Sequence, residues 1–287
     1  MLTEAKQRVL LGGCPLRLVA TFADSEWALA QVPFGQERDA AWRRQFTQVH
    51  AHREAMLVLQ GEVTQGLNGV VYHGGPGTVF LYDVGERHDG GFPPTAPDSD
   101  QMWMYFAPGF ITCQGIEVRS GRYGNDFRYS CKSPELIKRL NHAWDAAAKG
   151  GPTRLELAQA QLCALFSVLF TDVIAAAEQP PGGSSVQKEA ILEIKQFLQH
   201  TAGRGVDVTT LARMAGFSRS HFLRLFRQHV GMTVYEVINE VRRQRYYELL
   251  AEGVSMKVIA DELGLQSSSA LAHWRRKNID AKMRATE

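Results

Sequence analysis

Three side chains suited to binding chemistry alternate within one short stretch of the N-terminal half. His50, His52 and Glu54 stand immediately before the apolar run Ala55–Leu59. Alternate residues of a β-strand point to the same face, so these side chains are expected to lie on one face. Imidazole and carboxylate groups can ligate a transition metal, and they can also hydrogen-bond a polar small molecule. The stretch is therefore a candidate binding site.

A second set of candidate residues lies between Val208 and Arg227. This segment reads as two short helices, with Thr209 or Thr210 as the cap of the first and Ser218 as the cap of the second. Gly216 separates them and supplies the positive φ that a tight turn requires. The pattern predicts a helix-turn-helix, the unit that places its second helix in the major groove of DNA.

The second helix of this unit has two distinct faces. Phe222, Leu225 and Phe226 share one face and are expected to pack inward. The opposite face is predicted to contact DNA, and it carries Arg219, Ser220, Leu223, Arg224 and Arg227. The competing interpretation is an ordinary helical hairpin whose arginines are merely solvated, but each residue of the pattern has a separate mechanical role in the motif.

The elements that position the histidines are predicted to be short strands. Asn68-Gly69 lies between two of them and is a favourable hairpin turn, since both residues tolerate positive φ. Frequent short strands with such turns, from about Leu16 to Val118, favour a barrel or jelly roll. The strand candidates are Trp27–Val32, Ala55–Leu59, Val70–Tyr72, Thr78–Tyr82 and Gln101–Phe106.

Helical periodicity begins at Ser133-Pro134, a cap followed by proline at the first helical position. A second helix is predicted from about Thr153 to Ala177. It carries too many apolar residues for one surface helix, which favours packing on its own domain with one side and on a second subunit with the other. Burial wholly within one chain is the alternative. Pro180–Ser185 reads as a linker.

Composition agrees with two soluble domains of different charge. The 287 residues carry a net charge of +2. Residues 183–287 hold 16 Lys and Arg against 11 Asp and Glu, and residues 1–182 hold 16 against 19. The basic part is therefore the one expected to meet a polyanion. The four cysteines show no Cys-x-x-Cys spacing, which favours reduced thiols in the cytosol. We expect neither a secretion signal nor a membrane span, because the apolar run Leu162–Phe170 is short and interrupted.

The C-terminal segment resembles the DNA-binding domain of the AraC/XylS family of bacterial regulators. Gly231–Ile238 is similar to that family's approach to a long linker helix, and Val241–Leu250 is similar to the helix itself. Val254–Leu265 is similar to the opening of its second helix-turn-helix. A linker of about 18 residues is about 27 Å long, so it can hold two reading helices in successive major grooves.

The second unit departs from the family pattern. Aromatic residues are usual where Leu271 and Arg275 stand, arginine is usual at His273, and Trp274 is one position out of step. The unit is therefore interpreted as a phosphate clamp or as a repacked variant. The resemblance assigns DNA contacts in it to Ser268, Ser269, His273 and Arg276.

The N-terminal half resembles the cupin-type sensor of the same family. There a His-x-His strand and a later histidine, here His88, surround the mouth of a barrel. The resemblance implies an effector site of His50, His52, Glu54 and His88. Metal-binding cupins place a glutamate where Met56 and Leu57 stand, so Glu54 is an imperfect substitute and no metal is assigned. Structural roles stay open, as they do for Trp103, Tyr105 and Phe106, which could line the barrel or its core.

The sequence as a whole predicts an α+β protein. Residues 1–182 are expected to form a cupin-like β-barrel with helices that senses an effector and dimerises. Residues 183–287 are expected to form an all-α DNA-binding domain with two helix-turn-helix units. The predicted function is a cytoplasmic, homodimeric, effector-controlled transcription regulator without catalytic residues or cofactors. Its expected partners are double-stranded DNA, a small molecule such as a sugar and, if it is an activator, RNA polymerase. The alternative is a metal-dependent cupin dioxygenase or isomerase with an accessory helical domain.

Overall fold

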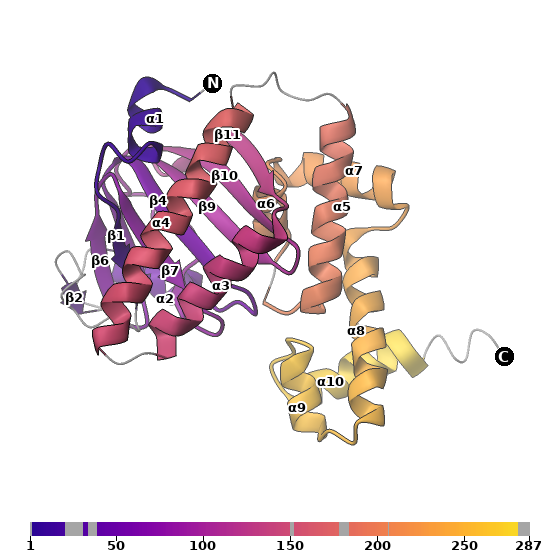
Figure 1. Cartoon of the computed structure of the whole chain (residues 1–287). Helices are drawn as coiled ribbons and strands as arrows, with labels where there is room; N and C mark the ends of the chain where they lie inside the picture. Colours follow the sequence, from indigo (N-terminus) through magenta and orange to yellow (C-terminus); the bar gives the residue numbers. More distant parts are fainter. Residues whose placement is uncertain are drawn as a thin grey trace. The chain divides into compact units, whose positions relative to one another are not determined.

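The chain folds into two compact units, Met1–Pro181 and Gly182–Glu287, in the computed structural model (Figure 1). Each unit is described by itself. The residues that the structure describes are 2–20, 31–33, 39–149, 152–177, 184–205 and 207–280.

The N-terminal unit is built on two β-sheets. The six-stranded sheet has the order β1-β7-β4-β9-β10-β11, and the five-stranded sheet has the order β2-β6-β5-β8-β3. The β1–β7 pair is parallel, and the other described pairs are antiparallel. The strands are β1 (Arg17–Val19), β2 (Gln31–Pro33), β3 (Thr47–Gln48), β4 (Glu54–Gly61), β5 (Val63–Leu67), β6 (Val70–Gly74), β7 (Thr78–Tyr82), β8 (His88–Asp89), β9 (Ser99–Ala107), β10 (Phe110–Arg119) and β11 (Arg122–Cys131).

Both faces of the six-stranded sheet are covered. Ala55, Leu57 and Leu59 of β4 belong to the hydrophobic core formed with the helices. By alternation, Glu54 and Met56 point to the opposite face, towards the five-stranded sheet. The helices of this unit are α1 (Glu4–Leu10), α2 (Ala40–Phe46), α3 (Pro134–Lys149) and α4 (Pro152–Ala177), of which α3 and α4 run across the six-stranded sheet (Figure 1).

Most of the strands and helices predicted from the sequence are present. Asn68 and Gly69 form the β5–β6 hairpin with φ of 46° and 86°. The helix predicted after Ser133 is α3, and the one predicted near residues 153–177 is α4. Residues 27–30 of the strand predicted at 27–32 lie outside the described residues. Its last two residues, 31 and 32, belong to β2.

Helix α4 is more apolar than an ordinary surface helix. Its stretch Glu156–Ala177 is long and apolar enough to cross a membrane by length and composition alone, a test that core helices also pass. Leu162, Phe166, Leu169 and Phe170 are at most 1% exposed in the core of the N-terminal unit. We therefore read α4 as a helix packed on its own sheet.

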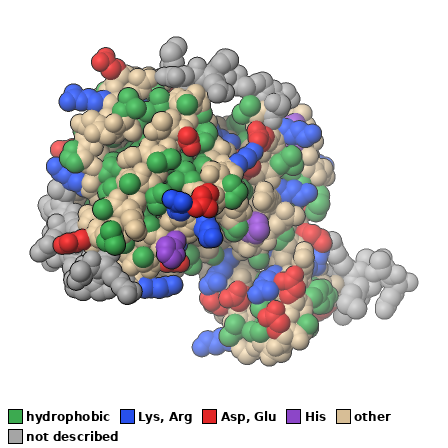
Figure 2. Space-filling model, viewed as in Figure 1, with side chains coloured by type: hydrophobic (Ala, Val, Ile, Leu, Met, Phe, Trp, Pro, Cys, Tyr) green, Lys and Arg blue, Asp and Glu red, His purple; other side chains and the backbone are tan. Residues whose placement is uncertain are grey.

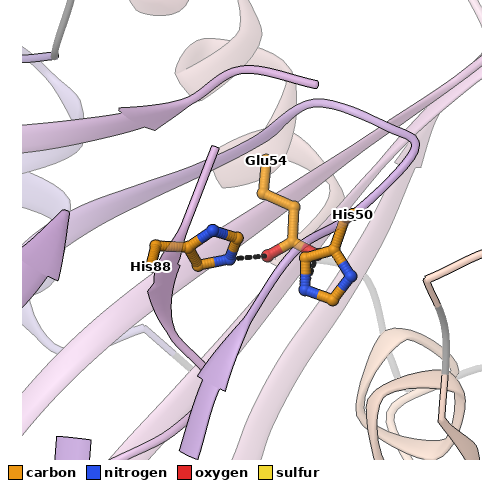
Figure 3. A group of neighbouring side chains, drawn as sticks. All are labelled: His50, Glu54 and His88. Atoms are coloured by element: carbon orange, nitrogen blue, oxygen red, sulfur yellow. Dashed lines mark ion pairs between the residues drawn. The ribbon is translucent and has the colours of Figure 1, made fainter. Parts of the chain in front are cut away.

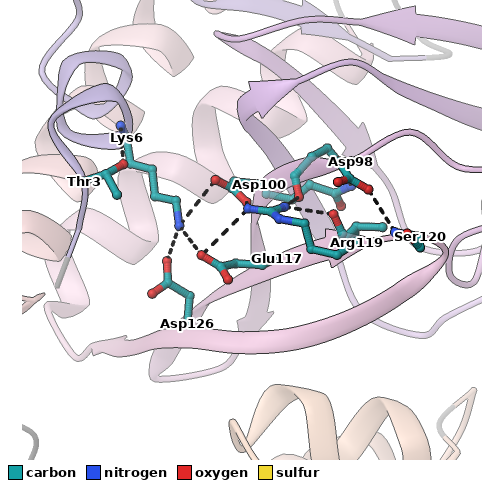
Figure 4. A network of polar contacts seen from close by, with 11 residues as sticks. Thr3, Lys6, Asp98, Asp100, Glu117, Arg119, Ser120 and Asp126 are labelled. Carbon is teal, nitrogen blue, oxygen red and sulfur yellow. Dashed lines mark hydrogen bonds and ion pairs between the residues drawn. The ribbon is translucent and has the colours of Figure 1, made fainter.

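A buried lysine fastens α1 to the six-stranded sheet (Figure 4). Lys6 is 2% exposed, and its Nζ lies 2.6 Å from Asp126, 2.9 Å from Glu117 and 3.4 Å from Asp100. Burial would lower the pKa of Lys6, but these carboxylates raise it above its ordinary value. Arg119 shares Asp100 at 2.7 Å, so the network joins α1 to β9, β10 and β11.

The C-terminal unit is entirely helical in its described part. Asp207, rather than Thr209 or Thr210, caps α6, because its carboxylate accepts from both of their backbone N–H groups. Gly216 has the expected positive φ of 77°, and Ser218 is the residue before α7. The helices are α5 (Ser184–Thr201), α6 (Val208–Met214), α7 (Arg219–Val230), α8 (Val234–Ala251), α9 (Met256–Glu262), α10 (Ser268–Arg275) and a π-helical turn, η2 (Arg276–Asp280).

Helix α8 is the predicted linker helix. It has 18 residues and begins at a capping box between Thr233 and Glu236. The end of α8 packs with α9 and α10 in a hydrophobic core of its own, which includes Leu271 and Trp274. The 18-residue length corresponds to about 27 Å, as the sequence predicted.

Candidate functional sites

His50, His52, Glu54 and His88 come together in the N-terminal unit. His50 and His52 lie just before β4, rather than within a strand, and Glu54 begins β4. The Glu54 Oε1 atom is 2.8 Å from His52 Nε2 and 3.5 Å from His50 Nε2. His88 Nε2 of β8 approaches Glu54 Oε2 at 3.7 Å (Figure 3). We call these four residues the histidine cluster.

Aromatic rings surround the histidine cluster. Tyr82 stacks on His88 with ring centroids 4.4 Å apart, and Trp103 stacks on Tyr82 at 5.9 Å. Tyr105 pairs with Glu54 across β4 and β9, so it shares that face of the sheet. Phe106 does not, since it packs edge-on against Trp144 of α3. Of the three aromatics proposed from the sequence, two belong to the cluster's side and Phe106 belongs to the helix-facing core.

The histidine cluster is buried and electrostatically coupled. Its four residues are 1–6% exposed. Burial would raise the pKa of the Glu54 carboxyl, but the charge of His50 and the hydrogen bond from His52 hold that pKa well below its usual range. A carboxylate kept ionised among imidazoles can accept hydrogen bonds from a polar ligand or share a cation with them.

Arg53 points the other way from the same segment and contacts α3. Its guanidinium lies 2.9 Å from Asp83, donates to Asn141 Oδ1 at 3.0 Å and pairs with Asp145. It also lies over the Trp144 ring, 5.3 Å from the centroid. The sequence analysis does not single out Arg53. Its position between His52 and Glu54 is a usable signal, because alternation along the chain points its side chain away from theirs.

A cavity of about 370 Å³ adjoins the histidine cluster, because His88 contributes to its wall. Two exposed arginines, Arg44 and Arg87, stand in the same wall. The cavity is lined by Arg44, Thr47, Gly66, Asn68, Gly69, Arg87, His88 and Asp89. Its size is in the range of small-molecule sites.

The first candidate DNA-contacting helix, α7, has the two faces that its sequence predicts. Phe222, Leu225 and Phe226 are at most 3% exposed and form its inner face. Leu223 is half-buried, and the remaining four predicted contact residues are exposed: Arg219, Ser220, Arg224 and Arg227. Helix α7 therefore presents three arginines on the side away from its core.

The second helix-turn-helix has a hydrophobic core that includes Leu271 and Trp274. Leu271 is buried at a position where the family usually has an aromatic residue. Trp274 is 7% exposed and its Nε1–H donates to Asn239 of α8 at 2.9 Å, so it fills the core from the neighbouring turn. Ser267 caps α10. The four predicted contact residues of this unit are all exposed: Ser268, Ser269, His273 and Arg276.

Comparison with known proteins matches both units. A family model for an AraC-like ligand-binding domain matches residues 32–166, and a helix-turn-helix domain model matches residues 211–285. The arabinose operon regulatory protein of Salmonella typhimurium is 26% identical over 183 residues, which are 62% of each chain. The match thus spans less than two thirds of that relative.

Solved structures of ToxT from Vibrio cholerae are more distant. Wild-type ToxT from strain SCE256 with bound unsaturated fatty acid is 12% identical, with 82% of this chain and 86% of that chain covered and a TM-score of 0.27. ToxT from strain O395 is also 12% identical, with 82% and 88% covered and a TM-score of 0.27.

Proposed function

Because this chain belongs to the AraC family of transcription regulators, we propose that it binds specific DNA sites under the control of a small-molecule effector. The observation that carries the proposal is the exposure of three arginines of α7 on the face opposite its buried phenylalanine pair. A helix held in this way can enter the major groove and reach base edges with its free face. The second unit adds Arg276, on its exposed side, as a phosphate contact.

The histidine cluster and its adjoining cavity form the proposed effector site. Buried hydrogen-bonding groups beside aromatic rings suit a small polar molecule, a sugar among them. Exposed arginines in the cavity wall also suit an anionic group on that molecule. Changing each histidine to alanine is expected to abolish the response to the effector while DNA affinity is kept.

We also propose that the chain is a homodimer through α4. The outer face of this helix carries Leu157 and Val168, which are 63% and 52% exposed, with Ala160 and Ala164 between them. These positions recur at helical spacing and form one apolar stripe, on a face where hydrophobic side chains are visible in Figure 2. Leu169 of the same helix faces the core and is 0% exposed, so it does not belong to the stripe.

The proposal as a whole assigns the protein to the cytoplasm, gives it no catalytic role and makes RNA polymerase a partner if it activates transcription. The full chain should retard duplex DNA at low salt, and its affinity should fall steeply as salt rises because phosphate contacts release counterions. A full-length, folded chain that retards no duplex at low salt would remove the basis of the assignment.

A further inference from the structure

We propose that His50, Glu54 and His88 bind one divalent transition-metal ion inside the N-terminal unit. One ligand atom from each residue can be chosen so that all lie within 4.8 Å of one another. Two imidazoles and a carboxylate are the donor set of many iron and zinc sites. The inference rests on the proposed function, because it concerns the proposed effector site. It names a divalent metal ion as a ligand of the histidine cluster.

The contacts of Glu54 are of two kinds. Its Oε1 atom is 2.8 Å from His52 Nε2, which is a hydrogen bond. The distances of 3.5 Å from Oε1 to His50 Nε2 and of 3.7 Å from Oε2 to His88 Nε2 are too long for good hydrogen bonds. Two ligand atoms, each about 2.1 Å from a tetrahedral ion, lie about 3.4 Å apart. Each of the two longer contacts thus has the spacing of a pair of ligands to one ion, through Oε1 for His50 and through Oε2 for His88, and His52 hydrogen-bonds the carboxylate.

The tautomer of His88 also supports a metal ion between His88 and Glu54. Its Nδ1 lies 3.2 Å from the carbonyl oxygen of Glu86, which can only accept, so Nδ1 carries a proton. In a neutral imidazole the lone pair is then on Nε2, facing Glu54 Oε2. Both atoms are buried, and neither has a hydrogen-bond partner among the described residues. Two buried acceptors that face each other repel, whereas a cation between them satisfies both.

The surroundings of the three residues suit a bound ion. His88 Nδ1 and its carbonyl partner fix the ring orientation, as outer contacts do for metal-ligating histidines. To ligate the ion, His50 Nε2 gives up its 3.1 Å contact with the side-chain oxygen of Gln48, and the ring proton moves to Nδ1. His88, one of the three proposed ligands, stands in the wall of the adjoining cavity.

The test is titration of the chelator-stripped full chain with Co²⁺, followed by visible absorption and by the melting temperature. We expect one Co²⁺ per chain, absorption bands of a low-symmetry site, and a melting temperature raised by several degrees because the ion binds only the folded state. His88→Gln and Glu54→Gln should weaken binding by at least about 100-fold, and His52→Gln by about 10- to 100-fold. His73→Gln changes an exposed histidine of β6 and should bind as the parent does.

The proposal is overturned if the folded parent shows neither new absorption nor a thermal shift with millimolar Co²⁺. It is equally overturned if His88→Gln binds Co²⁺ as tightly as the parent, since His88 is then not a ligand. If a variant does not fold, the stoichiometry and spectrum of the parent decide. Failure here leaves an organic effector at the same cluster intact, because the alanine variants test that response without added metal.

Discussion

Arg224 stands on the free face of α7, two residues after the buried Phe222 and two before the buried Phe226. Its planar fork of donors suits a bidentate contact with guanine in the major groove, which discriminates by about 1–3 kcal/mol. Arg224→Ala should therefore weaken a selected site by about 5- to 150-fold and barely change binding to unrelated DNA. Competition binding with selected and scrambled duplexes measures both.

Arg276 provides the contrast within the same protein. If it holds only phosphate, Arg276→Ala should weaken all duplexes alike and reduce the salt slope by about one ion. Arg139→Ala, an exposed arginine of α3, is the control and should change neither property. Equal losses on selected and scrambled duplexes for Arg224→Ala would reject its role as a base reader.

Arg53 lies beside the histidine cluster in the chain and contacts Asn141 and Asp145 of α3. Replacing it with leucine leaves Asp83, Asn141 and Asp145 without their shared donor. Charge-assisted hydrogen bonds of this type contribute about 1.5–3 kcal/mol each, less where the partner is exposed, so Arg53→Leu should lower the free energy of unfolding by about 2–3 kcal/mol. Urea unfolding followed by tryptophan fluorescence measures the loss. An unchanged midpoint would show that Arg53 does not support this junction.

At the scale of elements, the exposed apolar stripe of α4 is the proposed dimer contact. Leu157→Glu with Val168→Glu should convert a dimer to monomers, because both side chains are exposed in the single chain and their change leaves its core intact. Val84→Glu, a substitution of a valine that is 57% exposed in a turn, is the matched control. Light scattering of the parent and of both variants measures their oligomeric states. A parent chain that is already monomeric at micromolar concentration would refute the dimer.

The attachment of α1 predicts a pH dependence. The hydrogen bond from Lys6 lowers the pKa of Glu117, so the folded pKa lies below the unfolded value of about 4.3. The stabilisation is therefore present above that pH and is lost as the pH falls through the folded pKa. The melting temperature should fall between about pH 5 and pH 3, and less steeply in Lys6→Met. Parallel profiles for parent and variant would contradict the role of this network.

How far the sequence predicts these elements depends on whether the deciding interactions are local. Gly216 and the inward Phe222 and Phe226 signal α7 within a few residues, so that unit was predicted closely. Asp207 was missed as the cap of α6 because Thr209 and Thr210 are also capable caps. The packing of Trp274 against Asn239 joins residues far apart in the chain, which no local pattern reveals. For the same reason, the spacing within the histidine cluster and the attachments of Arg53 required the structure.

At the scale of the whole molecule, the two units carry different candidate sites. The N-terminal unit carries the histidine cluster and the apolar stripe of α4, and the C-terminal unit carries the positive excess and both helix-turn-helix units. Within the C-terminal unit, α8 is about 27 Å long and joins the two helix-turn-helix units. That length suits successive major grooves on one face of a duplex, which are about 34 Å apart.

The measurement that tests this account most directly is selection of binding sites for the full-length chain from random duplexes. The account predicts enrichment of a recurrent site that contains one sequence element read by α7. The element read by α7 should lose its sequence preference in the Arg224→Ala protein. Failure of the folded parent to enrich any sequence over the starting pool would contradict the claim that this chain is a sequence-specific regulator.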